Sequence, residues 1–151
     1  YRQGDDPKRL DWKLLARSDK AFVRLAPDHA VLGTTLLLDA SSSMAFPESE
    51  PNKWLQAKRL VVGLAAVTHA SGDPVGVTIA TADGLRRLEP RTRAGIVGDI
   101  ARSVDGVRPG GATPLADAVT SAAARVLVVT DCLGDLDMLR RALARHIARG
   151  G

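Results

Sequence analysis

Cysteine, aromatic residues and long apolar runs are all scarce in this chain of 151 residues. The single cysteine, Cys132, excludes an internal disulfide and any zinc site built from cysteines. Only five residues are aromatic, so the core has to be aliphatic, and a single-strand nucleic-acid binder would lack stacking platforms. No apolar run approaches the ~18 residues that a membrane-spanning helix needs. What remains is a globular chain whose length suits one domain.

Glutamate is also scarce, because fourteen of the 17 acidic residues are Asp and only three are Glu. Asp is typical of turns, helix caps and sites for hard metal ions. The formal net charge is +4, but acidic and basic residues are interleaved along most of the chain. No helix or loop concentrates Lys and Arg opposite an acid-free face before Arg140–Arg149. The arginines there suit a solvated helix face that complements the C-terminal dipole. Nucleic-acid binding through this helix is therefore the weakest functional hypothesis.

Two catalytic signatures are missing as well. The nucleophile elbow G-x-S-x-G does not occur, and Gly-Lys, which a Walker loop requires, never appears. His29, His69 and His146 lack the spacing of metal ligands. Cys132 has no His or Lys nearby in sequence that would activate a thiolate. These absences disfavour serine hydrolases, cysteine nucleophiles and P-loop nucleotide hydrolysis.

Apolar strands and amphipathic helices alternate along the chain, which predicts an α/β fold with a mostly parallel sheet and helices on both of its faces. The nearly continuous apolar run Val31–Leu38 is typical of a central strand that is buried on both faces. A hairpin turn at 82–84 makes the strands on either side of it an antiparallel edge pair. The other predicted strands are Ala21–Leu25, Val75–Thr81, Leu85–Leu88 and Val126–Thr130. The predicted helices are Lys53–Ala70, Ala94–Val104, Pro114–Ala124 and Leu136–Arg149.

Two of these strands end in loops rich in acidic and hydroxyl side chains, LLLDASSSM at Leu36–Met44 and VVTDCLGD at Val128–Asp135. A third loop, GGATPLADA at Gly110–Ala118, lies between helices and can reach the same edge of the sheet. Ligands of open α/β sheets bind outside the carboxyl ends of the strands. The oxygen donors that the three loops supply there are Asp39, Ser41, Ser43, Thr113 and Asp131.

This donor set predicts a divalent metal site. Positions i, i+2 and i+4 of an extended loop point the same way, so Asp39, Ser41 and Ser43 are expected to face one ligand. Two carboxylates, three hydroxyls and water match the oxygen coordination that Mg²⁺ or Mn²⁺ prefers. We expect the carboxylates of Asp39 and Asp131 within about 8 Å of each other, because both serve one ion. Each motif alone is equally well explained as a loop or a helix cap, so their joint placement carries the prediction.

The motifs resemble those of a known family. D-x-S-x-S from Asp39, Gly-Gly followed by T-P-L, and a strand ending in Thr130-Asp131 resemble the metal-ion-dependent adhesion site of von Willebrand factor A domains. The segment GDDPKRLDWKLLAR at Gly4–Arg17 resembles the signature that precedes the A-like domain in the bacterial family of unknown function numbered fifty-eight. The resemblance implies a signature segment at 1–28, packed on a von Willebrand A-like domain at 29–151. It implies that the five donors bind Mg²⁺, Mn²⁺ or Ca²⁺, directly or through water.

The function that this resemblance implies is metal-dependent binding of a protein, without catalysis. The ion would receive an Asp or Glu carboxylate from the partner. The implied partner is a MoxR-type AAA+ ATPase, in the assembly or maturation of other proteins. Relatives commonly carry membrane helices ahead of the domain, so the resemblance also implies a place on the cytoplasmic face of a membrane, anchored by segments outside this chain.

The chain departs from the family pattern in two places, and one enzyme class remains as an alternative. Ala112 separates the glycines from Thr113, so we expect this loop to sit one residue differently. A domains also continue into further strands after the helix that follows Asp131, and this chain is expected to lack them. A Mg²⁺-dependent phosphatase of the haloacid dehalogenase type would use Asp131 and Asp135 as metal ligands. It needs a second Asp two residues after its first, and this chain has Ser41 there.

Acidic and basic residues alternate in the segment Gly4–Arg17, and Trp12 offers one large apolar anchor. Such a pattern suits ion pairs around that anchor. We therefore predict that the segment is a structural brace, not a binding motif, and that Trp12 is largely buried against the A-like core.

Overall fold

The computed structural model describes residues 31–49, 52–120, 122 and 124–150. They belong to one compact unit, Val31–Gly151. The predictions for the strand Ala21–Leu25, the segment Gly4–Arg17 and Trp12 lie outside the described residues. Among the described residues, no helix combines the length and the apolar character needed to cross a membrane.

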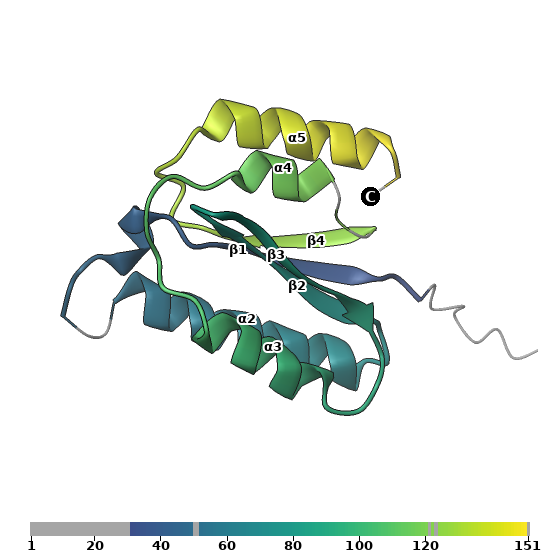
Figure 1. Cartoon of the computed structure of the whole chain (residues 1–151). Coiled ribbons are helices and arrows are strands. Elements are labelled where there is room, and N and C mark those ends of the chain that lie inside the picture. The colour runs from purple at the N-terminus through teal and green to yellow at the C-terminus, as the bar shows by residue number, and fades with distance from the viewer. Residues whose placement is uncertain (1–30, 50–51, 121, 123, 151) are drawn as a thin grey trace, which may run out of the picture. The chain divides into compact units, whose positions relative to one another are not determined.

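A four-stranded sheet forms the centre of this unit (Figure 1). Its strands are β1 (Thr34–Asp39), β2 (Val75–Thr81), β3 (Gly84–Arg91) and β4 (Arg125–Val129). Their order across the sheet is β3-β2-β1-β4. β1 runs parallel to β2 and β4, and β2 pairs with β3 in antiparallel orientation. The predicted mostly parallel sheet with an antiparallel edge pair is confirmed.

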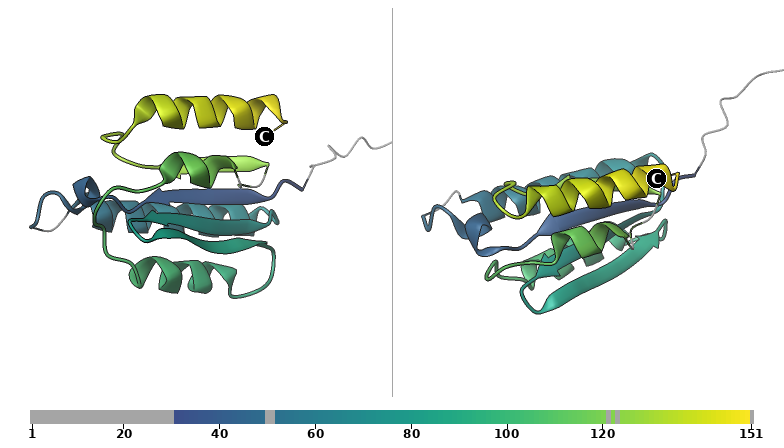
Figure 2. Two further views of the ribbon diagram at one scale, coloured as in Figure 1. Left: turned by 45° about the horizontal axis from the view of Figure 1, so that its top comes forward. Right: turned by 90° about the horizontal axis from the view of Figure 1, so that it is seen from above.

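Helices cover both faces of the sheet, as predicted. They are α2 (Lys53–Ala70), α3 (Ile96–Asp105), α4 (Leu115–Thr120) and α5 (Leu136–Ala148), with a short 3₁₀ helix η2 (Ser42–Ala45). Figures 1 and 2 show α2 and α3 together on one face, and α4 and α5 on the other. Because side chains alternate along a strand, Leu36 and Leu38 of β1 join the core cluster with α2 and α3, whereas Leu37 joins the one with α4 and α5.

β1 begins later than its apolar run. The sequence predicts a strand from Val31, but the first paired residue is Thr34, which lies opposite Val75 at the start of β2. Val31 has no strand beside it in the described residues, and 69% of its surface is exposed. The length of the neighbouring strand, not hydrophobicity, therefore decides where β1 starts.

β3 and α4 also differ in length from the prediction. β3 runs beyond Leu88 through Pro90, which a strand at the sheet edge tolerates because its outer N–H groups need no partner. α4 ends at Thr120 instead of Ala124. β4 begins at Arg125, whose N–H donates to Gly33 O at 3.0 Å, so Ala124 does not belong to the helix.

Candidate metal centre

Three loops meet at the edge of the sheet where β1 ends, on the left in Figure 1. Two backbone hydrogen bonds join the loop after β1 to the loop before α4: Ser42 N to Gly111 O at 3.0 Å, and Gly110 N to Ala40 O at 2.8 Å. Gly111 has a φ of 61°, in the left-handed region that favours glycine. A Cβ at Gly111 would lie 2.8 Å from the Cβ of Ala82. The position therefore requires glycine, and it fixes the path of the loop.

Asp39 is the last residue of β1, and only 3% of its surface is exposed. Its Oδ1 accepts the backbone N–H of Ser41 and the hydroxyl of Thr113, both at 2.9 Å. Its Oδ2 accepts the hydroxyl of Thr130 at 2.8 Å. In the part of the chain that the structure describes, no basic side chain forms an ion pair with Asp39. Neutral donors from three loops thus hold this carboxylate.

Asp131 follows β4 and faces the same centre. Its Oδ1 accepts the hydroxyl of Ser43 and the backbone N–H of Leu133, both at 3.2 Å. Its Oδ2 accepts the ammonium group of Lys53 at 2.7 Å, and the exposed fraction of the Asp131 side chain is 10%. Burial raises the pKa of the Asp131 carboxyl, but the hydrogen bonds from Lys53, Leu133 and Ser43 and the charge of Lys53 lower it by more. The net pKa lies below the ordinary value, so the group is a carboxylate at neutral pH.

Ser41 and Ser43 connect the two carboxylates, with 3.1 Å between their hydroxyl oxygens. The expectation that they converge by alternation along an extended loop is wrong. Ser41 is extended, with φ −66° and ψ 161°, but Ser43 lies within η2. The turn of this 3₁₀ helix carries the hydroxyl of Ser43 toward Asp131.

The structure thus brings all five sequence-predicted residues into one hydrogen-bonded set. It runs from Thr113 through Asp39, Ser41 and Ser43 to Asp131. Ala112 does not move Thr113 out of reach, because the Thr113 hydroxyl contacts Asp39 directly.

Sequence reasoning missed Lys53 and Thr130. The register of β1 and β4 pairs Leu38 with Val129, which places Thr130 beside Asp39, but the register is not visible in the sequence. Lys53 is the first residue of α2, and no acidic residue lies in the first helical turn. A cation is unfavourable at that end of a helix dipole. This mismatch is the one local signal that Lys53 has a carboxylate partner elsewhere.

The candidate centre has an apolar rim. Phe46 in the loop after β1 is 67% exposed, and Leu133 in the loop after β4 is 69% exposed. The ammonium group of Lys53 lies 5.7 Å from the centroid of the Phe46 ring. Beside the centre, a groove of about 400 Å³ between α2 and β4 is lined mainly by apolar atoms and includes Leu60 and Val129. A protein segment could therefore contact apolar and charged groups together at this edge.

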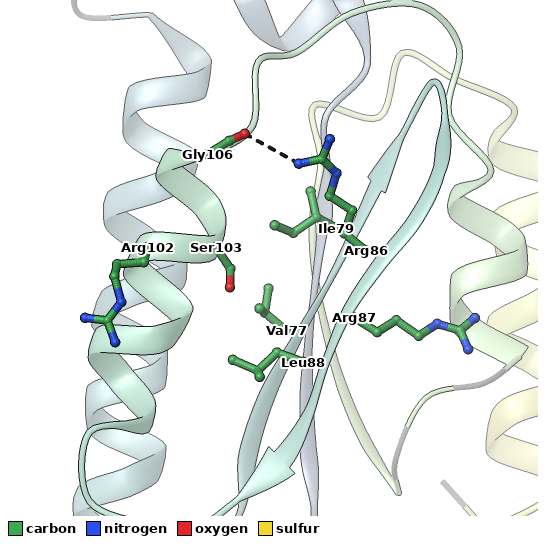
Figure 3. A pocket seen from close by; sticks show the side chains of 8 residues that line it. All are labelled: Val77, Ile79, Arg86, Arg87, Leu88, Arg102, Ser103 and Gly106. Atoms are coloured by element: carbon green, nitrogen blue, oxygen red, sulfur yellow. Dashed lines mark hydrogen bonds between the residues drawn. The ribbon is translucent and has the colours of Figure 1, made fainter.

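A second pocket, of about 290 Å³, lies between α3 and the β2–β3 pair (Figure 3). Its floor is apolar, with Val77 and Leu88. Figure 3 shows the guanidinium groups of Arg87 and Arg102 pointing away from it. The guanidinium of Arg86 is engaged with Gly106 O at 3.5 Å. This pocket presents no converging set of reactive groups, so it is not a candidate active site.

The donor set at the sheet edge fits a hard divalent cation. The described residues contain no cluster of three or more His, Cys, Asp or Glu side chains that could bind a metal, so hydroxyl oxygens would have to complete the coordination. Carboxylate, hydroxyl and water oxygens are ligands that Mg²⁺ and Mn²⁺ accept. The ammonium group of Lys53, which binds Asp131, shows that this position accommodates a cation. The residues that could hold the ion are Asp39, Ser41, Ser43, Thr113 and Asp131.

A family model and several uncharacterized relatives match this chain. The family model described as "Protein of unknown function DUF58" matches residues 1–149. The uncharacterized proteins Mb1516 of Mycobacterium bovis and Rv1480 of Mycobacterium tuberculosis are each 27% identical over 168 residues. Each alignment covers 97% of this chain and 50% of the relative. The chain therefore spans about half the length of these relatives.

Two solved structures share the architecture. One is an aerotolerance-related membrane protein from Bacteroides fragilis, with a TM-score of 0.59, 20% identity, and coverage of 79% of this chain and 63% of that one. The other is the VWA domain of SpRpn10, with a TM-score of 0.53, 12% identity, and coverage of 77% and 69%. The fold is von Willebrand A-like, as the motifs implied.

Proposed function

This chain belongs to the DUF58 family of unknown function, and we propose that its A-like domain binds a partner protein through a divalent cation. Asp39, Ser41, Ser43, Thr113 and Asp131 would hold the ion, which is Mg²⁺ or one of its close substitutes Mn²⁺ and Ca²⁺. When bound, the ion supplies a positive centre that an Asp or Glu carboxylate of the partner can approach.

The continuous hydrogen-bonded set from Thr113 to Asp131 carries this proposal. It joins residues from three loops. Two of these residues, Asp39 and Asp131, lie 92 positions apart in the sequence. Hydroxyl–carboxylate bonds of 2.9 Å from Thr113 to Asp39 and of 3.2 Å from Ser43 to Asp131 support one shared centre. An arrangement that served only to cap helices would not need to link both carboxylates.

The charges favour binding over catalysis. Two carboxylates just neutralise a divalent ion, and the three hydroxyls add no charge, so an incoming carboxylate meets no excess of negative charge. A hydrolase would need a free base to activate water. Lys53, the basic side chain that contacts this centre, is held in an ion pair with Asp131. The phosphatase alternative lacks its second carboxylate, because position 41 is a serine whose N–H binds Asp39.

For the partner we propose a MoxR-type AAA+ ATPase, with a role in the assembly or maturation of other proteins. The B. fragilis neighbour is described as a membrane protein. By analogy we propose that the present domain works at the cytoplasmic face of a membrane, to which segments outside this chain anchor it. Fractionation of cells expressing the full-length protein would test the anchoring, since recovery outside the membrane fraction contradicts it.

Calorimetry with the purified ATPase from the same organism tests the metal-bridged contact. We expect binding in Mg²⁺ and at least a tenfold loss of affinity in EDTA. Asp39→Ala should abolish binding and keep cooperative unfolding, because apolar residues hold β1 in the core. Asp83→Ala is the matched control, since Asp83 is exposed in the β2–β3 turn. Equal affinity in Mg²⁺ and EDTA would exclude the proposal.

A further inference from the structure

Lys53 occupies an electrostatically unusual place. It begins α2, where the helix dipole disfavours a cation, and the first turn offers no acidic side chain. Its ammonium group instead reaches Asp131 Oδ2, 2.7 Å away. This is the same carboxylate that the proposed function assigns to the divalent ion.

We propose that Lys53 is a built-in competitor for that ion: its ammonium group and a divalent cation exclude one another at Asp131. The inference rests on the proposed metal role of Asp131. Lys53 would then set the metal concentration at which the centre becomes competent to bind a partner.

The formal charges explain the competition. Asp39 and Asp131 contribute −2 and Lys53 contributes +1, so the centre carries −1 without metal. Adding a divalent ion while the ammonium stays in place would leave +1. A divalent and a monovalent cation about 5 Å apart repel enough to lower an affinity by about tenfold, even with the screening of water. The ion would therefore bind most favourably when the ammonium group withdraws.

The surroundings of Lys53 allow such a withdrawal. Its side chain is 34% exposed, so the ammonium group has a path to solvent along a flexible four-carbon stem. The exposed ring of Phe46 offers a second contact for the cation near its present position. Asp131 would keep the hydrogen bonds from Ser43 and Leu133, which both engage its other oxygen. Exchange of the two cations thus needs no rearrangement of the sheet.

The same contact would also stabilise the centre whenever no metal is bound. Asp39 and Asp131 are both shielded from solvent and belong to one hydrogen-bonded set. The ammonium group offsets the repulsion between their charges. Removing the ammonium group should therefore lower the stability of the metal-free protein and raise its affinity for the metal. One substitution thus has two effects of opposite sign.

Lys53→Met in the intact protein tests the proposal, because methionine keeps an unbranched apolar stem and removes the charge. The matched control is Lys58→Met on the same helix, whose ammonium group pairs with Asp105 at 2.8 Å, away from the centre. We expect calorimetry to give about tenfold tighter Mg²⁺ binding for Lys53→Met and no change for Lys58→Met. In EDTA, Lys53→Met should melt about 2–4 °C below the wild type. Its melting temperature should then rise more on Mg²⁺ addition than that of the wild type.

Lys53→Arg adds a variant that retains the charge. It should bind Mg²⁺ no more tightly than the wild type. Unchanged or weaker Mg²⁺ binding by Lys53→Met, with circular dichroism confirming a folded protein, would overturn the competition. So would an equal gain for Lys58→Met, which would point to a general effect of net charge.

The outcomes also separate this inference from the proposed function. If Lys53→Met tightens Mg²⁺ binding but the ATPase binds equally in Mg²⁺ and EDTA, the competition stands and the metal-bridged contact fails. If the contact requires Mg²⁺ but Lys53→Met leaves Mg²⁺ affinity unchanged, only the competition fails. Absence of Mg²⁺ binding in the wild type and in Lys53→Met would overturn both.

Discussion

The hydroxyl of Thr130 donates a hydrogen bond of 2.8 Å to Oδ2 of Asp39, across the boundary between β1 and β4 and over 91 positions of sequence. This bond fixes the orientation of the most buried carboxylate of the centre. It also couples the ends of two parallel strands, so that the loops after them start from a fixed geometry.

Thr130→Val should lower the free energy of unfolding by about 1–3 kcal/mol, because a buried charged acceptor loses one of its three donors. Valine keeps the shape of threonine, so packing changes little. Urea denaturation in EDTA measures the effect. In the Asp39→Asn background the same substitution should cost less, since the neutral amide is a weaker acceptor. An equal cost in both backgrounds would mean that the bond to Asp39 is not the cause.

Thr113→Val should weaken Mg²⁺ binding about tenfold or more, because it removes a neutral oxygen from the proposed donor set. The hydroxyl of Thr113 is 2.9 Å from Asp39 Oδ1. Thr113→Ser retains that oxygen and should stay within about threefold of the wild type. Calorimetric titration with Mg²⁺ decides the matter, and a serine variant as weak as the valine variant would contradict this role.

Gly111→Ala should destabilise the protein by about 1–3 kcal/mol, because φ is 61° there and the new Cβ would meet Ala82 at 2.8 Å. Gly110→Ala is the adjacent control. Its Cβ would have no neighbour within 4 Å, so we expect less than about 0.5 kcal/mol. Thermal and urea unfolding of both variants provide the comparison, and equal losses would argue against strain at Gly111.

Acidification of the metal-free protein should remove the stabilisation that Asp131 provides. Its folded-state pKa is lowered by hydrogen bonds and by Lys53, despite burial. A depressed pKa contributes stability above the unfolded value of about 3.9, and this contribution disappears as pH falls through the folded value. Between about pH 5 and 2, in EDTA, the wild type should therefore lose its advantage over Asp131→Asn. The control Asp83→Asn should run parallel to the wild type, and a constant gap for Asp131→Asn would refute the assignment.

Local sequence was sufficient for the architecture and for most of the donor set. A strand that is buried on both faces must be apolar along its length, whatever strands lie beside it. The apolar run before Asp39 therefore predicted β1, and Asp39 marked its polar end. The bounds of α2 were also predicted correctly, since Asn52 caps the helix by accepting the N–H of Leu55 at 2.9 Å. The carboxyl ends of parallel strands share one edge, which brought Asp39 and Asp131 together in the prediction.

Tertiary structure alone decided what each carboxylate contacts. Lys53 and Asp131 are 78 positions apart, and their contact depends on strand order, on the register of β1 against β4 and on where α2 begins. The 3₁₀ turn that directs Ser43 toward Asp131 was predicted as an extended loop. Propensity and periodicity act over a few residues, so they determine elements and their ends. Which donor reaches which oxygen is set by packing between distant segments, and that information exists only once the chain has folded.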